Sequence, residues 1–346
     1  MRDLEDPNDP QASCLAPGAH VGSYRVERVL AEGGMGVVYV ATHTLLPRRA
    51  ALKVLRAELG GVPRALESLL EEARVLESLR DAPAVRVYDV GVLPDGRPWL
   101  AMELVDGACL AELIVPDAGL ALERAATLVE AIASALAAAH ALNVVHGDVK
   151  PENIIVTADS RAHLIDWGIA RRMCVRQTHA AAVGTPPYMS PEQIRGEPLD
   201  ERADVYALGV VAYELLTGSM PFGGADPSEV FCQHLATLPC APRELRAELP
   251  VELDELVLAM LAKSPGARPT LAAIRAVCAR FGGGLPELVA APAAVELARV
   301  DTVSPAAARA RWTPQLPLEA RETTRLRRVV DAAGGAAAAG TIERLA

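Results

Sequence analysis

Closely spaced cysteines are missing from this chain of 346 residues. Its six cysteines form no CxxC pair and no Cys/His cluster at the spacing of metal ligands. They are Cys14, Cys109, Cys174, Cys232, Cys240 and Cys278. Because zinc sites and disulfide frameworks need cysteines in pairs or clusters, this scatter argues against both and is typical of free thiols in a reducing compartment.

An excess of positive charge is also missing, since 34 Lys and Arg residues stand against 44 Asp and Glu residues and the net charge is -10. We therefore expect no nucleic-acid partner and no electrostatic binding to an anionic membrane. No uncharged apolar run approaches the roughly 18–20 residues of a membrane helix, so we expect no membrane span. The acidic, proline-broken start MRDLEDPNDP is unlike a signal peptide. These absences predict a soluble, cytoplasmic protein.

Two regions of different periodicity make up most of the chain. Residues 24–105 contain short strand-like runs separated by glycine or proline, with one amphipathic helical stretch from Leu66 to Leu79. The strand-like runs are YRVERVL, VVYVATH, RAALKVL, VRVYDVGVL and PWLAMELV. This pattern predicts an antiparallel sheet with one helix packed on it.

Residues 106–281 are mainly helical in pattern. The stretch 122–142 is apolar on most of its circumference, which predicts a buried helix. Residues 153–166 read as a strand, a turn and a second strand, and 201–218 and 251–264 read as further helices. The fold class expected for the two regions together is α+β.

The two ends of the chain have a different composition. Residues 1–23 are rich in Pro, Asp and Gly, which predicts a mobile N-terminal tail. Residues 282–346 are rich in Ala, Pro and Gly, which predicts a C-terminal tail that is mostly linker.

A glycine-rich stretch, LAEGGMGVVYVA, spans residues 30–41 between two predicted strands. Glycines at such a place let backbone amides close over phosphate groups, because no side chain blocks the approach. The alternative is a simple hairpin turn with Gly34 or Gly36 at positive φ.

Lys53 lies in the apolar strand-like run RAALKVL. A lysine is costly to bury without a partner, so a functional lysine here needs an acidic side chain nearby. Glu72, at the margin of the apolar stripe of the following helix, is the candidate, and Glu71 competes with it. The alternative is an edge-strand lysine whose amine reaches solvent.

The strongest motif is VVHGDVKPENIIV at residues 144–156. It specifies five residues within eight positions, namely His146, Asp148, Lys150, Pro151 and Asn153. DWG follows at 166–168 and GTPPYMSPE at 184–192. Each segment alone could be a turn or a helix cap, but their order and spacing together indicate a catalytic site.

With these motifs the chain from Tyr24 to about Arg280 resembles a protein kinase, and in detail the bacterial eukaryotic-like serine/threonine kinases. The resemblance rests on LxEGGMGVVY, DVKPEN and YMSPEQ. It implies a two-lobed fold, with residues 24–105 as the N-lobe and 106–281 as the C-lobe. It also implies transfer of the ATP γ-phosphate to Ser or Thr hydroxyls of protein substrates in bacterial signalling.

The same resemblance implies roles for the catalytic residues. Asp148 is expected to position and accept the substrate hydroxyl proton, and Lys150 to contact the γ-phosphate. Lys53 is expected to hold the α- and β-phosphates, oriented by an ion pair with Glu72. Magnesium is the implied cofactor, with Asn153 and Asp166 as its protein ligands.

A nucleotide-binding set follows from the resemblance as well. It comprises the glycine-rich loop over the phosphates, an apolar slot for adenine, and a hinge whose backbone bonds the adenine edge behind a gatekeeper side chain. The implied residues are Ala31, Gly33, Gly34, Gly36, Val38, Ala51, Lys53, Met102 as gatekeeper, Glu103, Val105 and Ile155.

Other positions match supporting residues of the family. Asp204 resembles the aspartate that ties down the catalytic loop, and Glu192 is expected to pair with Arg268. An apolar spine between lobes is implied for Leu76, His146 and Trp167.

Three positions depart from the family pattern. Ala31 replaces the first glycine of the loop, Trp167 replaces the phenylalanine of DFG, and Gly147 replaces the arginine of HRD. That arginine normally pairs with phosphate on the activation loop, so we expect activity that does not require loop phosphorylation. Thr178 is the candidate phosphosite, and neighbouring arginines could still order it.

Two alternatives to a protein kinase stay open on the sequence: a pseudokinase scaffold and a small-molecule kinase of related fold. Lys53, Asp148, Asn153 and Asp166 are all present, which argues against the scaffold. Separately, Cys109 is a candidate reactive thiol at a helix N-terminus, with a buried packing cysteine as the competing interpretation.

Overall fold

The computed structural model describes residues 14–33, 36–56, 63–79, 84–167, 171–172, 185–224 and 226–282, in two compact units. Unit 1 contains the described residues up to Asp106 together with Asp166 and Trp167, and unit 2 contains the remainder. The predicted change of character after residue 105 lies next to this division.

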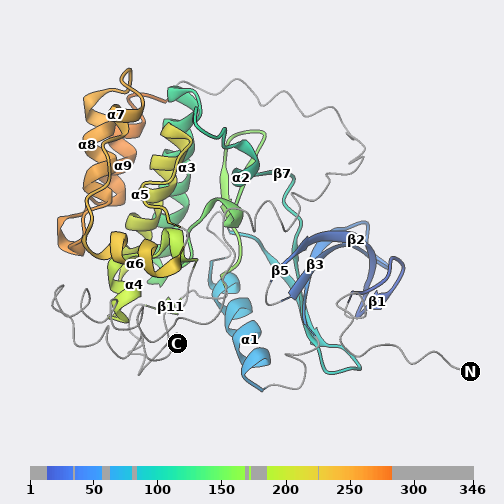
Figure 1. Cartoon of the computed structure of the whole chain (residues 1–346). Helices are drawn as coiled ribbons and strands as arrows, with labels where there is room; N and C mark the ends of the chain where they lie inside the picture. The colour runs from blue at the N-terminus through green and yellow to red at the C-terminus, as the bar shows by residue number, and fades with distance from the viewer. Residues whose placement is uncertain are drawn as a thin grey trace, which may run out of the picture. The chain divides into compact units, whose positions relative to one another are not determined.

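Unit 1 is a six-stranded antiparallel sheet with strand order β1-β2-β3-β4-β6-β5, together with helix α1 (Figure 1). The elements are β1 (His20–Val21), β2 (Tyr24–Glu32), β3 (Gly36–His43), β4 (Arg49–Leu55), α1 (Pro63–Ser78), β5 (Val87–Val92) and β6 (Pro98–Glu103). The predicted antiparallel sheet with one helix is therefore confirmed.

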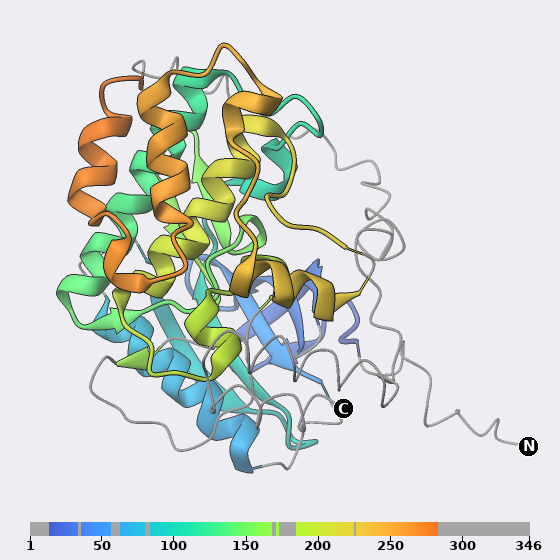
Figure 2. The ribbon, with the colours of Figure 1, turned by 60° about the vertical axis from the view of Figure 1, so that its left-hand side comes forward.

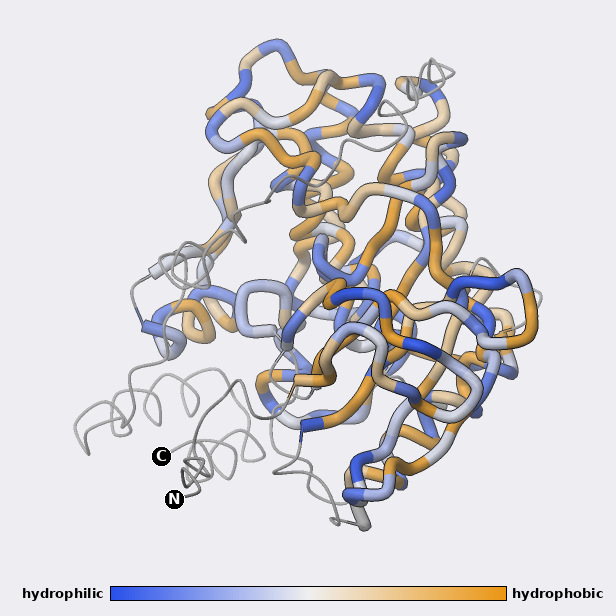
Figure 3. Tube along the Cα trace, turned by 90° about the vertical axis from the view of Figure 1, so that its right-hand side faces the viewer, coloured by the Kyte–Doolittle hydropathy of each residue, from blue (hydrophilic) through white to orange (hydrophobic). Residues whose placement is uncertain are grey.

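The sheet of unit 1 has two faces of different character, because side chains alternate along each strand. On one face Tyr39 lies opposite Leu52, and both join an apolar core that includes Trp99. On the other face Val38 lies opposite Lys53, so this face carries the lysine of the apolar strand. Figure 3 shows the trace of the chain coloured by hydropathy, with hydrophobic and hydrophilic residues along it.

Strand β1 lies within the segment that the sequence assigned to a mobile tail. His20 and Val21 pair with Arg25 and Tyr24, and Val21 is completely buried. The assignment of residues 20–21 to a tail is therefore wrong, because a two-residue strand is too short to show a period in the sequence. Residues 1–13 and 283–346 lie outside the described residues.

Unit 2 is mainly helical, with short strands in and around the VVHGDVKPENIIV motif (Figures 1 and 2). Its elements are β7 (Gly107–Cys109), α2 (Leu110–Leu113), α3 (Leu122–Ala141), β8 (Val144–Val145), η3 (Pro151–Asn153), β9 (Ile154–Thr157), β10 (Ala162–Leu164), β11 (Arg171–Arg172), η4 (Pro186–Tyr188), α4 (Pro191–Arg195), α5 (Glu201–Thr217), α6 (Pro227–Ala236), α7 (Pro242–Leu245), α8 (Val251–Met260), η5 (Pro265–Ala267) and α9 (Leu271–Cys278).

Helices α3 and α5 form the centre of unit 2. Helix α3 is rich in alanine and buries half of its 20 residues, as its apolar circumference predicts. Helix α5 begins at Asp200, whose carboxylate accepts a hydrogen bond from the amide of Arg202, and ends at Gly218 in the left-handed conformation. Helices α8 and α9 pack beside this pair (Figure 1).

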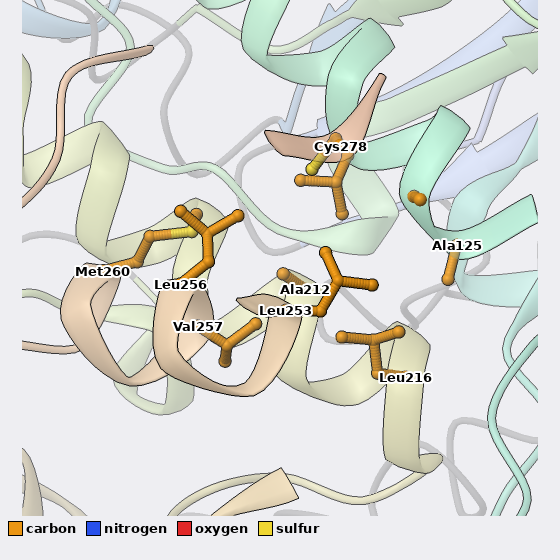
Figure 4. Close-up of a pocket in the computed structure, with 10 residues that line it drawn as sticks. Ala125, Ala212, Leu216, Leu253, Leu256, Val257, Met260 and Cys278 are labelled. Carbon is orange, nitrogen blue, oxygen red and sulfur yellow. The ribbon is translucent and has the colours of Figure 1, made fainter. Parts of the chain in front are cut away.

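A small apolar cavity of about 10 Å³ lies among these four helices (Figure 4). Side chains such as Leu216, Val257 and Met260 line it together with the thiol of Cys278. Burial raises the pKa of Cys278 to about 12, so the thiol stays protonated. A space of this size without polar partners is a dry packing void, not a ligand site.

The VVHGDVKPENIIV motif contains β8, η3 and most of β9, which pairs with β10 in an antiparallel hairpin. The predicted strand, turn and strand of residues 153–166 are confirmed as this hairpin, in which Ile155 pairs with His163. Pro151 begins the short 3-10 helix η3, where its missing amide hydrogen costs nothing. Helix α3 packs against β8 and β10, so the motif is attached to a buried helix as well as to this hairpin.

Candidate active site

Lys53 forms a buried ion-pair cluster in unit 1. Its Nζ lies 2.9 Å from both carboxylate oxygens of Glu72 and 2.8 Å from Oδ1 of Asp166. Burial lowers the pKa of Lys53, but the charges of Glu72 and Asp166 outweigh burial, so the pKa lies above its ordinary value. The structure selects Glu72 as the partner, while Glu71 is exposed and pairs with Arg74.

Asp166 adopts a backbone conformation that is unusual for a residue with a side chain. Its φ is 60°, in the left-handed region. Strain of this kind persists only where the surrounding structure holds it, and it occurs often at functional sites. The side chain of Asp166 is nearly half exposed, in contrast to the buried side chain of Glu72.

The glycine-rich loop closes the β2–β3 hairpin. The amide of Gly33 donates a 2.9 Å hydrogen bond to the carbonyl of Gly36. Gly36 is not at positive φ; a Cβ there would instead collide with the backbone carbonyl of Val54 in β4. The positive φ that the alternative allowed for Gly36 is therefore wrong, although the loop does join two strands of a hairpin, and Gly34 lies outside the described residues. Ala31 is exposed opposite Val38.

Several residues of the expected nucleotide set share a face of the sheet. Val38 lies opposite Lys53, and Ala51 lies opposite both Val40 and Met102, so these side chains point to the same side. Glu103 ends β6, and its amide donates to the carbonyl of Arg86. Val105 is partly buried.

Ile155 belongs to unit 2, where β9 pairs it with Cys109 of β7. The thiol of Cys109 lies 3.5 Å from the carbonyl of Pro151, and helix α2 behind it has only four residues. Burial raises the pKa of Cys109 above its ordinary value. The hypothesis of a reactive thiol with a depressed pKa is therefore wrong.

Asp148 is the centre of a hydrogen-bond network in unit 2. Its Oδ2 lies 2.8 Å from Nζ of Lys150, and its Oδ1 accepts hydrogen bonds from the backbone amide and hydroxyl of Thr185 at 3.1 and 3.0 Å. Nζ of Lys150 also donates to the hydroxyl of Thr185 at 2.5 Å. The carboxylate and the amine are thus positioned together beside the GTPPYMSPE segment.

Asn153 is oriented by the same network. Its Nδ2 donates to the backbone carbonyl of Asp148 at 2.9 Å and to Oδ2 of Asp148 at 3.1 Å. Because the amide nitrogen is engaged in this way, the amide oxygen is the atom of Asn153 that can take a cation. The backbone carbonyl of Asn153 accepts from the amide of Ile165, one residue before Asp166.

Asp204 binds the backbone of the VVHGDVKPENIIV motif through hydrogen bonds. Its two carboxylate oxygens accept hydrogen bonds of 2.8 Å from the amides of His146 and Gly147, and Nε2 of His140 lies 2.7 Å from Oδ2. Burial raises the pKa of Asp204, but the hydrogen bond and charge of His140, with His146 and the Gly147 amide, outweigh burial and lower it. Asp204 therefore stays ionised and anchors the loop.

Gly147 has a φ of 77°, so its backbone lies in the left-handed region that glycine adopts without strain. Its carbonyl accepts a 2.6 Å hydrogen bond from Nε2 of Gln193. Gln193 also accepts a hydrogen bond from the amide of Ser190 in the capping box of α4. Glycine at position 147 therefore allows the left-handed backbone, in addition to removing the charge of the arginine in HRD.

The ion pair expected between Glu192 and Arg268 is present and buried. Nη1 and Nη2 of Arg268 lie 2.6 and 2.8 Å from the two carboxylate oxygens of Glu192. This bidentate pair attaches the end of the GTPPYMSPE segment to unit 2. Of the residues expected in an apolar spine, Leu76, Trp167 and His146 are each fully buried.

Sequence reasoning missed two residues of this site, His140 and Gln193. His140 is a buried histidine in an otherwise apolar helix, and Gln193 is the last residue of a Ser-x-x-Gln capping box. The capping-box pattern is readable from sequence and could have drawn attention to Gln193. Thr178 and the arginine side chains near it lie outside what the structure describes.

The Protein kinase domain family model matches residues 24–279 of the chain. The serine/threonine-protein kinase PknB of Mycolicibacterium smegmatis is 40% identical over 270 residues, which cover 75% of this chain and 43% of that protein. PknB of Corynebacterium glutamicum is 38% identical over 257 residues, and a probable serine/threonine-protein kinase of Streptomyces coelicolor is 39% identical over 255 residues. These alignments cover 71% of this chain and 40% and 38% of the two proteins.

The chain thus spans about two fifths of the length of these relatives. In the part of the chain that the structure describes, no helix is long and apolar enough to cross a membrane. The ion pair of Lys53 with Glu72, the network around Asp148 and the family match over residues 24–279 agree with one another. The chain belongs to the protein kinase family, among the bacterial serine/threonine kinases of the eukaryotic type.

Proposed function

We propose that the protein transfers the γ-phosphate of ATP to serine or threonine hydroxyls of protein substrates in bacterial signalling. The observation that carries the proposal is the network of Asp148 with Lys150 and Thr185. A carboxylate beside a lysine, held against a segment of peptide-binding type, is what a positioned base for a hydroxyl nucleophile requires.

In unit 1, Lys53 is the residue that binds the α- and β-phosphates. The ion pair with Glu72 fixes the amine of Lys53, which lies in strand β4. The raised pKa of Lys53 keeps this amine charged. The glycine-rich loop, with Gly33, Gly34 and Gly36, covers the phosphates with backbone amides. Both effects position charge without a covalent step, which is what phosphoryl transfer needs.

The apolar face beside Lys53 accommodates the adenine ring. Val38, Ala51 and Met102 project from this face, and Ile155 is proposed as a further member of the set. The backbone of Glu103 and Val105 bonds the adenine edge. Apolar walls with a few polar backbone groups are the usual composition of such a site.

In unit 2, Asp148 accepts the proton of the substrate hydroxyl and Lys150 binds the γ-phosphate. The carboxylate of Asp148 and the amine of Lys150 are 2.8 Å apart. The Thr185 hydroxyl hydrogen-bonds to the side chains of both Asp148 and Lys150. This supports binding of a peptide along the GTPPYMSPE segment with its hydroxyl at Asp148. A tyrosine hydroxyl lies much further from its backbone, so this arrangement favours serine or threonine.

The family implies ATP and a divalent metal, and the residues present fit magnesium. Asp166 and Asn153 supply carboxylate and amide oxygens, the ligand types that Mg²⁺ prefers. Among the residues that the structure describes, no three His, Cys, Asp or Glu side chains form a metal cluster. Magnesium typically completes its shell with substrate phosphates and water, and it supplies charge neutralisation for the phosphates.

Gly147 indicates how activity is controlled. With glycine in place of the arginine of HRD, the position has no positive charge that an activation-loop phosphate could neutralise. The Gln193 amide instead ties the end of the segment to the Gly147 carbonyl. Control by partners, by the flanking tails or by closure of the two lobes is therefore the proposed alternative to loop phosphorylation.

The test is incubation of the protein with γ-labelled ATP and Mg²⁺, together with a generic protein substrate and a metabolite extract. The proposal predicts label on serine and threonine after acid hydrolysis of the protein fraction. Label confined to a metabolite would indicate a small-molecule kinase, and label nowhere would indicate a scaffold. Either of those two results would contradict the proposal.

A further inference from the structure

The glycine-rich loop of unit 1 is attached differently on its two sides. On the β3 side, Gly36 pairs with Leu55 of β4, and the pairing continues along the strand. On the β2 side, Gly33 directly follows the strand, and its amide bonds the carbonyl of Gly36. A Cβ at Gly33 would have its nearest neighbouring atom 3.8 Å away, so Gly33 is not packed tightly. The position of the β2 side therefore depends on hydrogen bonds.

Arg56 adds a hydrogen bond on the β2 side of the loop. This residue directly follows Leu55 at the end of β4, and its Nε donates to the backbone carbonyl of Gly33 at 3.1 Å. Strand β4 is not part of the β2–β3 hairpin, because β3 lies between β2 and β4 in the sheet. The side chain of Arg56 therefore connects the loop to a strand outside the hairpin that contains it.

The guanidinium of Arg56 is a suitable donor for this bond. Arg56 is half-buried, and within the residues that the structure describes no carboxylate forms an ion pair with it. Arginine stays charged in proteins, and a hydrogen bond from a charged donor is stronger than one from a neutral donor. Arg28 of β2 is a contrast, because its Nη1 donates to the carbonyl of the adjacent Val29 at 3.3 Å and connects no separate segments.

We propose that Arg56 is a positioning residue for the nucleotide phosphates and acts on them through the glycine-rich loop. The inference rests on the proposed function, in which backbone amides of the loop cover the phosphates. A peptide unit is planar and trans, so a bond that holds the Gly33 carbonyl also sets the direction of the N–H in the same unit. A loop that is already held in its bound conformation loses less conformational entropy when the nucleotide binds, which raises the affinity.

Two variants with side chains of matched length separate the hydrogen bond from the charge. The Nε2 atom of glutamine lies the same number of bonds from Cα as Nε of arginine. Arg56→Gln therefore keeps a donor at this place and removes the charge. Arg56→Met has a methyl group at the same place, so it removes both the donor and the charge.

The first test measures nucleotide affinity by isothermal titration calorimetry. The ligands are the non-hydrolysable imido analogue of ATP with Mg²⁺, and adenosine, which has no phosphates. Arg56→Met is expected to raise Kd for the ATP analogue by about three- to tenfold, up to the contribution of one hydrogen bond. Arg56→Gln should lie closer to the unmodified protein. Kd for adenosine should stay the same in all three proteins, because adenosine does not contact the loop.

Arg28→Met is the matched control, since it makes the same change on the same sheet without touching the loop. Its Kd for the ATP analogue is expected to equal that of the unmodified protein. A damaged sheet would weaken the binding of adenosine and of the ATP analogue together. Such a parallel loss in Arg56→Met would show a merely structural role and overturn the proposal.

The second test needs no nucleotide and measures hydrogen exchange of the Gly33 amide, which bonds the carbonyl of Gly36. If Arg56 holds the loop, this amide exchanges at least about threefold faster in Arg56→Met than in the unmodified protein. Equal exchange rates would overturn the proposal. In the calorimetry, an unmodified protein that binds no ATP analogue would refute the proposed function and this inference together. Normal binding that Arg56→Met leaves unchanged would refute this inference alone.

Discussion

The side-chain amide of Gln193 donates a 2.6 Å hydrogen bond to the backbone carbonyl of Gly147. Gly147 directly precedes Asp148, and Gln193 belongs to the helix that ends the GTPPYMSPE segment. The bond therefore connects the position of that segment to the backbone that carries Asp148. Because neither partner of this hydrogen bond is charged, the connection does not depend on a phosphate group.

Gln193→Leu removes this donor and leaves a buried carbonyl without its partner. We expect a loss of about 1–3 kcal/mol in the free energy of unfolding. If the bond orients Asp148, kcat falls by about tenfold or more while KM for ATP is unchanged. Steady-state kinetics on a peptide substrate, alongside urea unfolding, measures both effects.

Ser190→Ala is the matched control for that variant. It removes the capping hydroxyl of α4, at a typical cost of about 1 kcal/mol, and leaves the bond to Gly147 in place. Its kcat is expected to stay near that of the unmodified protein. A loss of kcat that simply follows the loss of stability in both variants would show that Gln193 is only structural.

Substitutions at Gly147 test why glycine stands there. Because φ is 77°, Gly147→Ala is expected to reduce the free energy of unfolding by about 1–2 kcal/mol. Gly147→Asn should lose less, since asparagine tolerates the left-handed region. Urea unfolding of the three proteins gives the order. An alanine variant as stable as the glycine protein would contradict the backbone explanation.

Much of this architecture was predictable from sequence because its signals are local. The period of the strands predicts the sheet of unit 1, and the amphipathic helix offers Glu72 as a partner for Lys53, with Glu71 as its competitor. The bonds from Gln193 to Gly147 and from His140 to Asp204 join residues 46 and 64 positions apart. No local pattern encodes such contacts, and the left-handed backbone of Gly147 appears only once the loop is closed around Asp204.

The same limit explains the errors. Cys109 is the N-cap of helix α2, but that helix has only four residues. The Cys109 thiol contacts the backbone carbonyls of Pro151 and Glu152. A two-residue strand such as β1 has no readable period, so its segment resembled a tail.

The pH dependence of stability tests the anchor at Asp204. Its pKa is lowered in the folded protein, so the unfolded state binds its proton more readily and the carboxylate stabilises the fold above its unfolded pKa of about 3.9. This contribution is lost as pH falls through the lower folded pKa. Asp204→Asn is therefore expected to cost about 2–4 kcal/mol at pH 7 and progressively less below about pH 4.

Urea unfolding of both proteins from pH 7 to pH 2.5 measures this difference. Asp254→Asn, at a partly buried carboxylate outside the anchor, serves as a control for the loss of a carboxylate elsewhere in unit 2. A difference between Asp204→Asn and the unmodified protein that stays constant down to pH 2.5 would contradict a depressed pKa.

Independence from loop phosphorylation is tested at Thr178. Phosphatase-treated Thr178→Ala protein is expected to retain most of its initial rate on an added protein substrate, because Gly147 offers no charge for a phosphate to neutralise. The comparison is with phosphatase-treated and untreated unmodified protein in the same assay. Loss of most of the rate in the variant, with recovery when the unmodified loop is phosphorylated again, would refute this account of control.

The central claim is that Asp148 is the base for phosphoryl transfer, and kcat of Asp148→Asn measures it most directly. Asparagine keeps the size of the side chain but not its charge, so urea unfolding first checks that the variant is folded. At saturating ATP and Mg²⁺ we predict that kcat on a protein substrate falls by roughly 10²–10⁴, the usual contribution of a positioned base. A folded Asp148→Asn protein with near-normal kcat would contradict the account.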